Sequence, residues 1–153
     1  PDMSGDEAAA LAVYAVPDLL AATRQTCAAQ LSPDGFLAQR GDWLAQRYAA
    51  QQTAVWPQAR AALFKVAGAK AGDQLKNFAT LPDNAIRPLA DALIQQEAAT
   101  QIHPKSCRNI ERMAAALAPL EPEQAGKIMA VMFDIATESQ KLAARIQDHP
   151  SQP

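Results

Sequence analysis

The spacing of apolar residues is the feature that most constrains how this chain can fold. No stretch alternates apolar and polar residues for long enough to predict a β-strand, and nearly every segment between proline and glycine positions has helical spacing. Alanine, the strongest helix former, supplies much of the 49% apolar content, whereas aromatic residues make up only 5%. The pattern therefore predicts an all-α protein with an aliphatic core built by close approach of helices.

Prolines and glycines divide this pattern into five to six predicted helices. A proline inside a helix lacks the backbone N–H and collides with the preceding turn, so we expect kinks or breaks at Pro17, Pro57 and Pro104. Together the segments predict a helical bundle. The helices are expected at about residues 7–31, 34–67, 73–81, 84–102, 104–120 and 123–147.

The length of 153 residues suits one domain with a core of its own. We expect a single helical domain over residues 7–147, between flexible ends at residues 1–6 and 148–153. No apolar run approaches the roughly twenty residues of a membrane-spanning helix. The net charge is −2 and the lysines and arginines are scattered, so no nucleic-acid partner is expected.

Two cysteines, Cys27 and Cys107, lie on the apolar faces of two predicted helices. One interpretation is a pair of separate buried thiols, because free cysteine is among the most buried residue types. The other, which we favour, is a disulfide, and closing a loop of about 80 residues contributes roughly 4 to 5 kcal/mol in the chain-entropy model. Because such bonds persist in exported proteins, the pair predicts a periplasmic or extracellular location after removal of a signal peptide.

His103 and Cys107, four positions apart, are not interpreted as a metal or catalytic pair. Zinc sites need three or four ligands, and the chain contains no CxxC and no HExxH motif. The residue before a proline is disfavoured in a helix, so His103 is interpreted as a helix-junction residue preceding Pro104. Nucleotide-binding and haem-attachment motifs are also missing from the sequence. No catalytic residue, metal or cofactor is therefore expected.

The last predicted helix combines an apolar side with a charged side. Met129 and Met132, beside Phe133, are interpreted as core residues that fill gaps. Charges of both signs at helical spacing are typical of a solvated face. The apolar side comprises Ile128, Val131, Ile135, Leu142 and Ile146, and the charged side comprises Lys127, Asp134, Glu138, Lys141 and Arg145.

A short segment concentrates the tryptophans with arginines. Arg40, Trp43 and Arg47 follow one another at spacings of three and four, so they share one helix surface with the guanidinium groups near the indole. Together with Tyr48 they form the candidate partner-binding surface, because tryptophan, tyrosine and arginine are enriched at interface hot spots. The alternative is that Trp43 and Trp56 are core residues covered by arginine stems.

These observations favour a small exported, non-enzymatic helical protein that binds another protein, such as an immunity protein, an inhibitor or an adaptor. A helical ligand-binding or sensor domain with an apolar cavity is the alternative, which an unfilled pocket would favour. The third candidate is a small all-α enzyme with an arginine-lined site for an anionic substrate. The residues that this enzyme would use are Arg24, Arg40, Arg47 and Arg60 with Glu97 or Glu111. For the favoured protein-binding role, the sequence identifies neither the partner nor the oligomeric state.

Overall fold

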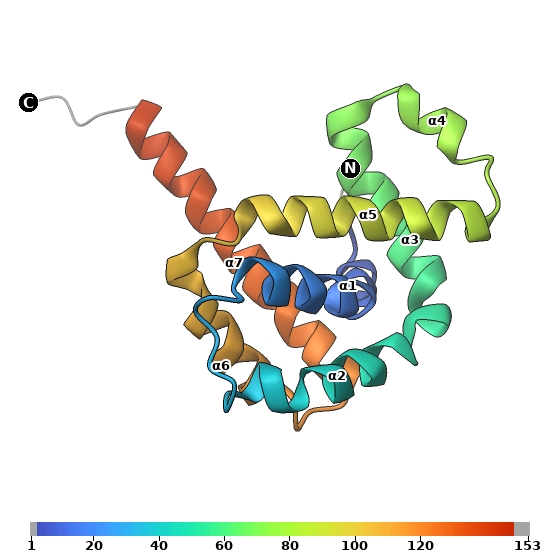
Figure 1. Ribbon diagram of the computed structural model, residues 1–153. Helices are drawn as coiled ribbons and strands as arrows, with labels where there is room; N and C mark the ends of the chain where they lie inside the picture. The colour runs from blue at the N-terminus through green and yellow to red at the C-terminus, as the bar shows by residue number, and fades with distance from the viewer. Residues whose placement is uncertain (1–2, 149–153) are drawn as a thin grey trace, which may run out of the picture.

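The structure, a computed structural model, describes residues 3–148, apart from the side chains of residues 70, 74 and 75. Within that range every regular element is helical, and the predicted all-α bundle is confirmed (Figure 1). In chain order the elements are α1 (Gly5–Thr26), α2 (Phe36–Ala49), α3 (Gln52–Ala71), α4 (Gln74–Phe78), α5 (Asp83–Gln101), the 3₁₀ helix η1 (Pro104–Ser106), α6 (Cys107–Leu117) and α7 (Pro122–Asp148).

Helix α1 lies at the centre of the bundle. Figure 1 shows it surrounded by α2, α3, α5 and α7, and each of these four helices packs against it. The helix begins with a capping box, in which the Ser4 hydroxyl accepts the Glu7 N–H and the Glu7 carboxylate accepts the Ser4 N–H. Its buried side chains point to several sides of the helix, and many are small enough for close packing. They are Ala9, Ala10, Val13, Tyr14, Ala15, Val16, Asp18, Leu20, Ala22 and Thr23.

Two apolar clusters share α1. The first joins α1 to α2, to the C-terminal end of α6 and to α7, and the second joins α1 to α3 and α5. Burying one large apolar side chain contributes about 1.5 to 3 kcal/mol, so these clusters are the main source of stability. The first comprises Val13, Val16, Leu20, Leu37, Leu44, Tyr48, Ala118 and Ala125, and the second comprises Ala10, Tyr14, Trp56, Ala59, Ile86 and Ala90.

The helix expected over residues 34–67 is divided in two at Ala50 and Gln51. Pro57, where the interruption was expected, lies inside α3, close to its N-terminus. There it removes a single intrahelical hydrogen bond, which a helix tolerates more easily near its start than in its middle. Pro17 likewise lies inside continuous α1, whereas Pro104 begins η1. The division leaves α2 packed against α6, whereas α3 packs mainly against α1.

The ends of the chain were expected to be flexible over residues 1–6 and 148–153. Ser4 caps α1, Asp6 lies in its first turn, and Asp148 is the last residue of α7. Residues 1–2 and 149–153 lie outside the described part of the chain. Among the helices that are described, none combines the length and the apolar character needed to cross a membrane.

Helix α7 packs on α1 through its smallest residues. Ala125, Gly126 and Ala130 are buried in this contact. A β-carbon at Gly126 would lie 2.6 Å from Val13 Cγ2 and 2.9 Å from the Ala9 carbonyl oxygen. The absence of a side chain at Gly126 therefore allows the two helix backbones to approach closely.

The large apolar residues of α7 lie toward solvent instead. The interpretation of Met132 as a core residue was wrong, because Met132 is 36% exposed and the neighbouring Phe133 is 63% exposed, while Met129 packs against the first cluster. The reason is geometric: α7 continues beyond the bundle (Figure 1), and from Val131 to Asp148 every residue except Thr137 is exposed. All five residues of the predicted apolar side are exposed, namely Ile128, Val131, Ile135, Leu142 and Ile146.

Candidate functional site

The two cysteines meet where α1 ends and α6 begins. Cys27 and Cys107 are fully buried at disulfide-bonding distance, with their Cα atoms 5.7 Å apart. Cys27 is the C-cap of α1 and Cys107 is the first residue of α6, so the bridge joins one end of the central helix to the second half of the chain. His103 is exposed and precedes η1 with extended backbone angles, as expected for a helix junction.

The three residues predicted to share a helix surface do so on α2. The Arg40 guanidinium lies 4.3 Å from the centroid of the Trp43 ring, and the Arg47 guanidinium lies 5.5 Å from it. Trp43 is 41% exposed, so its indole has guanidinium groups beside it and a face open to solvent. We refer to Arg40, Trp43 and Arg47 as the tryptophan platform.

Arg47 also holds the platform to the rest of the fold. Its Nη1 atom donates to the carbonyl oxygens of Ala118 and Leu120 at 2.8 and 2.9 Å, and Nη2 pairs with Glu121 at 3.2 Å. These acceptors lie at the C-terminal end of α6 and in the connection to α7, where helix carbonyls lack intrahelical partners. Arg47 therefore joins α2, which carries the platform, to the segment between α6 and α7.

Tyr48, the fourth residue predicted for this surface, lies in the core. Its side chain is 2% exposed and belongs to the first apolar cluster. Burial raises the pKa of its phenol above the ordinary value. Trp56 is also a core residue, at 5% exposure with its ring centroid 5.1 Å from that of Tyr14. The residues that offer a surface are therefore Trp43 and Arg40, supported by Arg47.

The start of α2 is capped from a distance. Gly35, at the N-cap position, has no side chain to accept a backbone N–H, and the Glu111 carboxylate of α6 accepts the Leu37 N–H at 3.0 Å instead. A β-carbon at Gly35 would lie 2.8 Å from Glu111 Oε2, so the glycine leaves room for that carboxylate. Glu111 thus positions the helix that carries the platform.

The arginines proposed for an enzyme site do not all meet, because Arg40 and Arg47 lie beside the Trp43 ring whereas Arg24 and Arg60 bind elsewhere. Arg24 pairs with Asp42 at 2.5 Å and donates to the Leu37 carbonyl oxygen at 2.9 Å, while Arg60 donates to the Ala79 carbonyl oxygen at 3.0 Å. Arg24, Arg47 and Arg60 therefore donate to carbonyl oxygens in three different segments of the chain. Glu111 is used as the cap of α2, and Glu97 is exposed on α5. No group of three or more histidine, cysteine or acidic side chains that could hold a metal occurs between residues 3 and 148.

The sequence analysis missed a pair of carboxyl groups between α1 and α5. Asp18 is 6% exposed, and its Oδ1 accepts from Gln95 Nε2 at 2.9 Å while its Oδ2 has no hydrogen-bond partner. Burial, and then the neighbouring Asp91, raise the pKa of Asp18 to about 7. Tyr14 donates to Asp91 Oδ1 at 2.9 Å. A signal was present, because Asp18 follows Tyr14 by four positions and so shares its face of the apolar helix.

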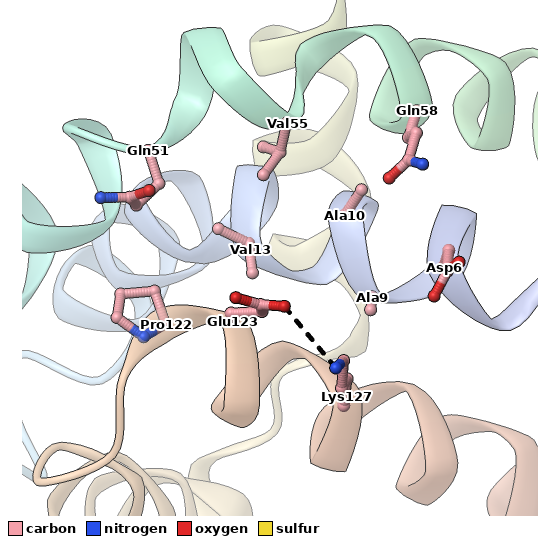
Figure 2. A pocket seen from close by; sticks show the side chains of 10 residues that line it. All are labelled: Asp6, Ala9, Ala10, Val13, Gln51, Val55, Gln58, Pro122, Glu123 and Lys127. Carbon is pink, nitrogen blue, oxygen red and sulfur yellow. Dashed lines mark ion pairs between the residues drawn. The ribbon is translucent and has the colours of Figure 1, made fainter.

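A pocket of about 370 Å³ lies between α1, α3 and α7. Figure 2 shows Ala9, Ala10 and Val13 of α1 along it, with the Glu123–Lys127 ion pair of α7 on one side. On the α3 side, Val55 points inward. Half of the residues that line the pocket are polar, so the pocket is a groove with a polar rim and not an enclosed apolar cavity. The remaining lining residues are Asp6, Gln51, Gln58 and Pro122.

No protein-family model, curated protein or solved structure matches this chain. The function is therefore inferred from the side chains described above.

Proposed function

We propose that this chain is an exported helical protein that acts by binding another protein through the tryptophan platform of α2. The observation that carries the proposal is the arrangement of Trp43, whose partly exposed ring lies near two guanidinium groups. Tryptophan and arginine are the residues that most often dominate binding energy at protein interfaces. A role as an inhibitor, immunity protein or adaptor suits such a surface.

The platform is pre-organised for binding. Arg47 makes two hydrogen bonds to backbone carbonyls and one ion pair, so it is already ordered before a partner arrives. Ordering a long side chain at an interface costs about 0.5 to 1.5 kcal/mol, and that cost is avoided here. Arg40 has its guanidinium over the indole and remains exposed, so it is available to a carboxylate of the partner. The expected partner therefore presents an apolar pocket with acidic groups at its edge.

The cysteine pair supports the location assigned in this proposal. Both sulfur atoms are fully buried and at bonding distance, and stable disulfides are kept in the periplasm or outside the cell. Thiol titration of protein taken from its native source, denatured without reductant, measures this directly. Finding no reactive thiol would support export, and finding two would contradict it.

The binding proposal is tested by affinity capture from the exported fraction of the native source. Wild-type protein, Trp43→Ala and Arg40→Ala are compared with the control Leu89→Ala, which removes a similarly exposed apolar side chain from α5. A partner should bind the wild type and the control and be lost from Trp43→Ala, with unchanged circular dichroism. Partners captured equally by Trp43→Ala would show that the platform is not the binding surface.

The pocket of Figure 2 favours a second candidate, the binding of a small ligand. Its volume of about 370 Å³ falls within the range of known ligand sites. Gln58→Trp would fill the pocket, whereas Gln46→Trp places the same side chain on an exposed part of α2. Native mass spectrometry of protein purified from its source should show a bound small molecule that is lost only from Gln58→Trp. A spectrum without added mass in the wild type would count against a ligand.

A further inference from the structure

We propose that two copies of this chain associate by antiparallel pairing of the outer face of α7. This face is defined by six large apolar residues, which are Ile128, Val131, Met132, Ile135, Leu142 and Ile146. It belongs to a different helix from the tryptophan platform and shares no residue with it, so this proposal does not depend on the proposed function.

The outer face is exposed along its whole length. Ile135 is 61% exposed, Leu142 is 59% exposed and Ile146 is 63% exposed. In the described part of the chain nothing covers residues 138–148, and Figure 1 shows this end of α7 projecting from the bundle. An isolated helix of about this length is only marginally stable in water, so most of its stability must come from packing. A projecting helix with an unburied aliphatic side is therefore incomplete as a monomer.

The spacing along the outer face is that of a helix-pairing seam. Ile128, Met132, Ile135, Leu142 and Ile146 fall on alternating steps of four and three, with Ser139 at the one polar position in the series. At 1.5 Å per residue the seam is about 27 Å long. The contact with α1 uses the side formed by Ala125, Gly126 and Ala130, so pairing through the outer face leaves the fold undisturbed.

The charges beside the seam select a second copy in antiparallel orientation. One flank carries two acids, Asp134 and Glu138, followed by two bases, Lys141 and Arg145. Within one helix this order places like charges four residues apart, which is unfavourable. When the two seams overlap fully in antiparallel orientation, the centre of the contact lies near residue 137, and Asp134 of each copy lies near Lys141 of the other. Parallel pairing would instead place the charges against the opposite flank, which carries Ala136 and Ala143.

These charges also argue against a membrane surface as the occupant. The two acids and two bases beside the seam cancel, whereas helices that lie on anionic membranes carry an excess of lysine and arginine. A second copy covers the apolar face and also pairs Asp134 of each chain with Lys141 of the other. Because each copy contributes a single helix, the buried area should fall below the roughly 800 Å² per partner of stable interfaces, and the dimer should dissociate on dilution.

Sedimentation velocity across a concentration series tests the proposal. The wild type should approach twice the chain mass of 16.3 kDa as concentration rises. Ile135→Asp places a charge in the middle of the seam and should raise the dissociation constant at least ~10-fold. The matched control is Phe133→Asp, which makes the same change at a side chain of similar exposure on the other side of α7. It should leave the dimer intact.

Monomeric wild type up to about 200 μM, or a dimer that survives Ile135→Asp, would overturn the proposal, because a seam of this length cannot tolerate a buried, unpaired charge. Circular dichroism and thermal unfolding check that both variants keep their fold. Binding of monomers to anionic vesicles, lost in Ile135→Asp, would assign the face to a membrane instead and would also overturn it.

Charge reversal tests the orientation. The variant K141E/R145E carries four acids beside the seam, and D134K/E138K carries four bases. In antiparallel pairing each variant alone should dimerise more weakly than the wild type, because like charges then face each other, and a mixture should form a heterodimer. Unchanged homodimers of both variants would exclude the antiparallel arrangement.

Discussion

Helix α1 and the outer part of α7 are both rich in apolar residues, yet their surroundings are opposite. In α1 the buried side chains are contacted by α2, α3, α5 and α7, and residues as different as Val13 and Asp18 are removed from solvent. In α7 the larger residues face water beyond Ala130, while the smallest residues of the helix make its contact with the bundle. Apolar content therefore identifies a face that needs a neighbour, but it does not say whether the neighbour belongs to the same chain.

The largest expected effect concerns the bridge at the end of α1. Replacing both cysteines by serine should lower the free energy of unfolding by about 4 to 5 kcal/mol, because the loop of about 80 residues is no longer closed in the unfolded chain. Urea unfolding, followed by circular dichroism, measures the change. A loss below about 1 kcal/mol would mean that the bridge does not restrict the unfolded chain as this model requires.

The next effect compares equal changes in the two regions. Leu20→Ala, in the first apolar cluster, should cost about 2 to 5 kcal/mol because it removes buried methyl groups and leaves a cavity. Phe133→Ala, on the exposed part of α7, should change the unfolding free energy by less than about 0.5 kcal/mol. Thermal unfolding of the two variants gives both values. Equal losses of unfolding free energy in the two variants would show that the outer part of α7 is as well packed as α1, which would contradict the comparison above.

A smaller effect is expected where the two regions meet. Gly126→Ala should destabilise the fold by about 1 to 3 kcal/mol, because its methyl group would lie too close to Val13 and to the Ala9 backbone. Gly68→Ala in α3 is the matched control, because no atom lies within 4 Å of the added carbon. The control should gain up to about 1 kcal/mol from helix propensity. Stabilisation by Gly126→Ala in chemical denaturation would show that the two helices can move apart at little cost.

The smallest expected effect is a dependence of the unfolding free energy on pH, caused by the Asp18 carboxyl group of α1. The pKa of Asp18 is raised to about 7 in the fold, so the folded protein binds its proton more tightly than the unfolded chain does. Stability should therefore fall as pH rises from about 4 to about 7 and then level off. Asp18→Asn should remove this dependence and stabilise the protein at pH 8 by about 1 kcal/mol or more, since one pKa unit corresponds to about 1.4 kcal/mol.

Urea midpoints of the wild type and Asp18→Asn between pH 4 and pH 8 check the prediction. Asp91, Tyr14 and Arg87 also face this region and are unchanged in the variant. Parallel pH profiles of the two proteins would assign the dependence to one of those groups instead.

The sequence predicts what depends on local spacing. Helical periodicity gives the all-α class and most helix positions, and matching apolar faces bring Cys27 and Cys107 together. Spacings of three and four correctly place Arg40 and Arg47 near the ring of Trp43, although the binding role of that surface stays a prediction.

What the sequence could not predict depends on contacts between distant segments. Tyr48 is an exception, because its spacing from Leu37 and Leu44 already places it on the apolar face of the predicted helix, where the structure has it. The carbonyl acceptors of Arg47 lie 71 and 73 positions away, so no spacing rule identifies them. For α7, periodicity shows an apolar side correctly, but whether that side is buried depends on where the rest of the bundle ends.

The cap that Glu111 provides for α2 has a consequence for redox control. Cys107 and Glu111 are one turn apart on α6, so the bond that holds Cys107 to Cys27 also keeps the Glu111 carboxylate at the Leu37 N–H. Cutting that bond with a reductant would free α6 to withdraw, leave the start of α2 uncapped, and let the helix that presents Trp43 unwind from its first turn. The binding proposed for Trp43 would then depend on the bridge, so a reducing agent should weaken it.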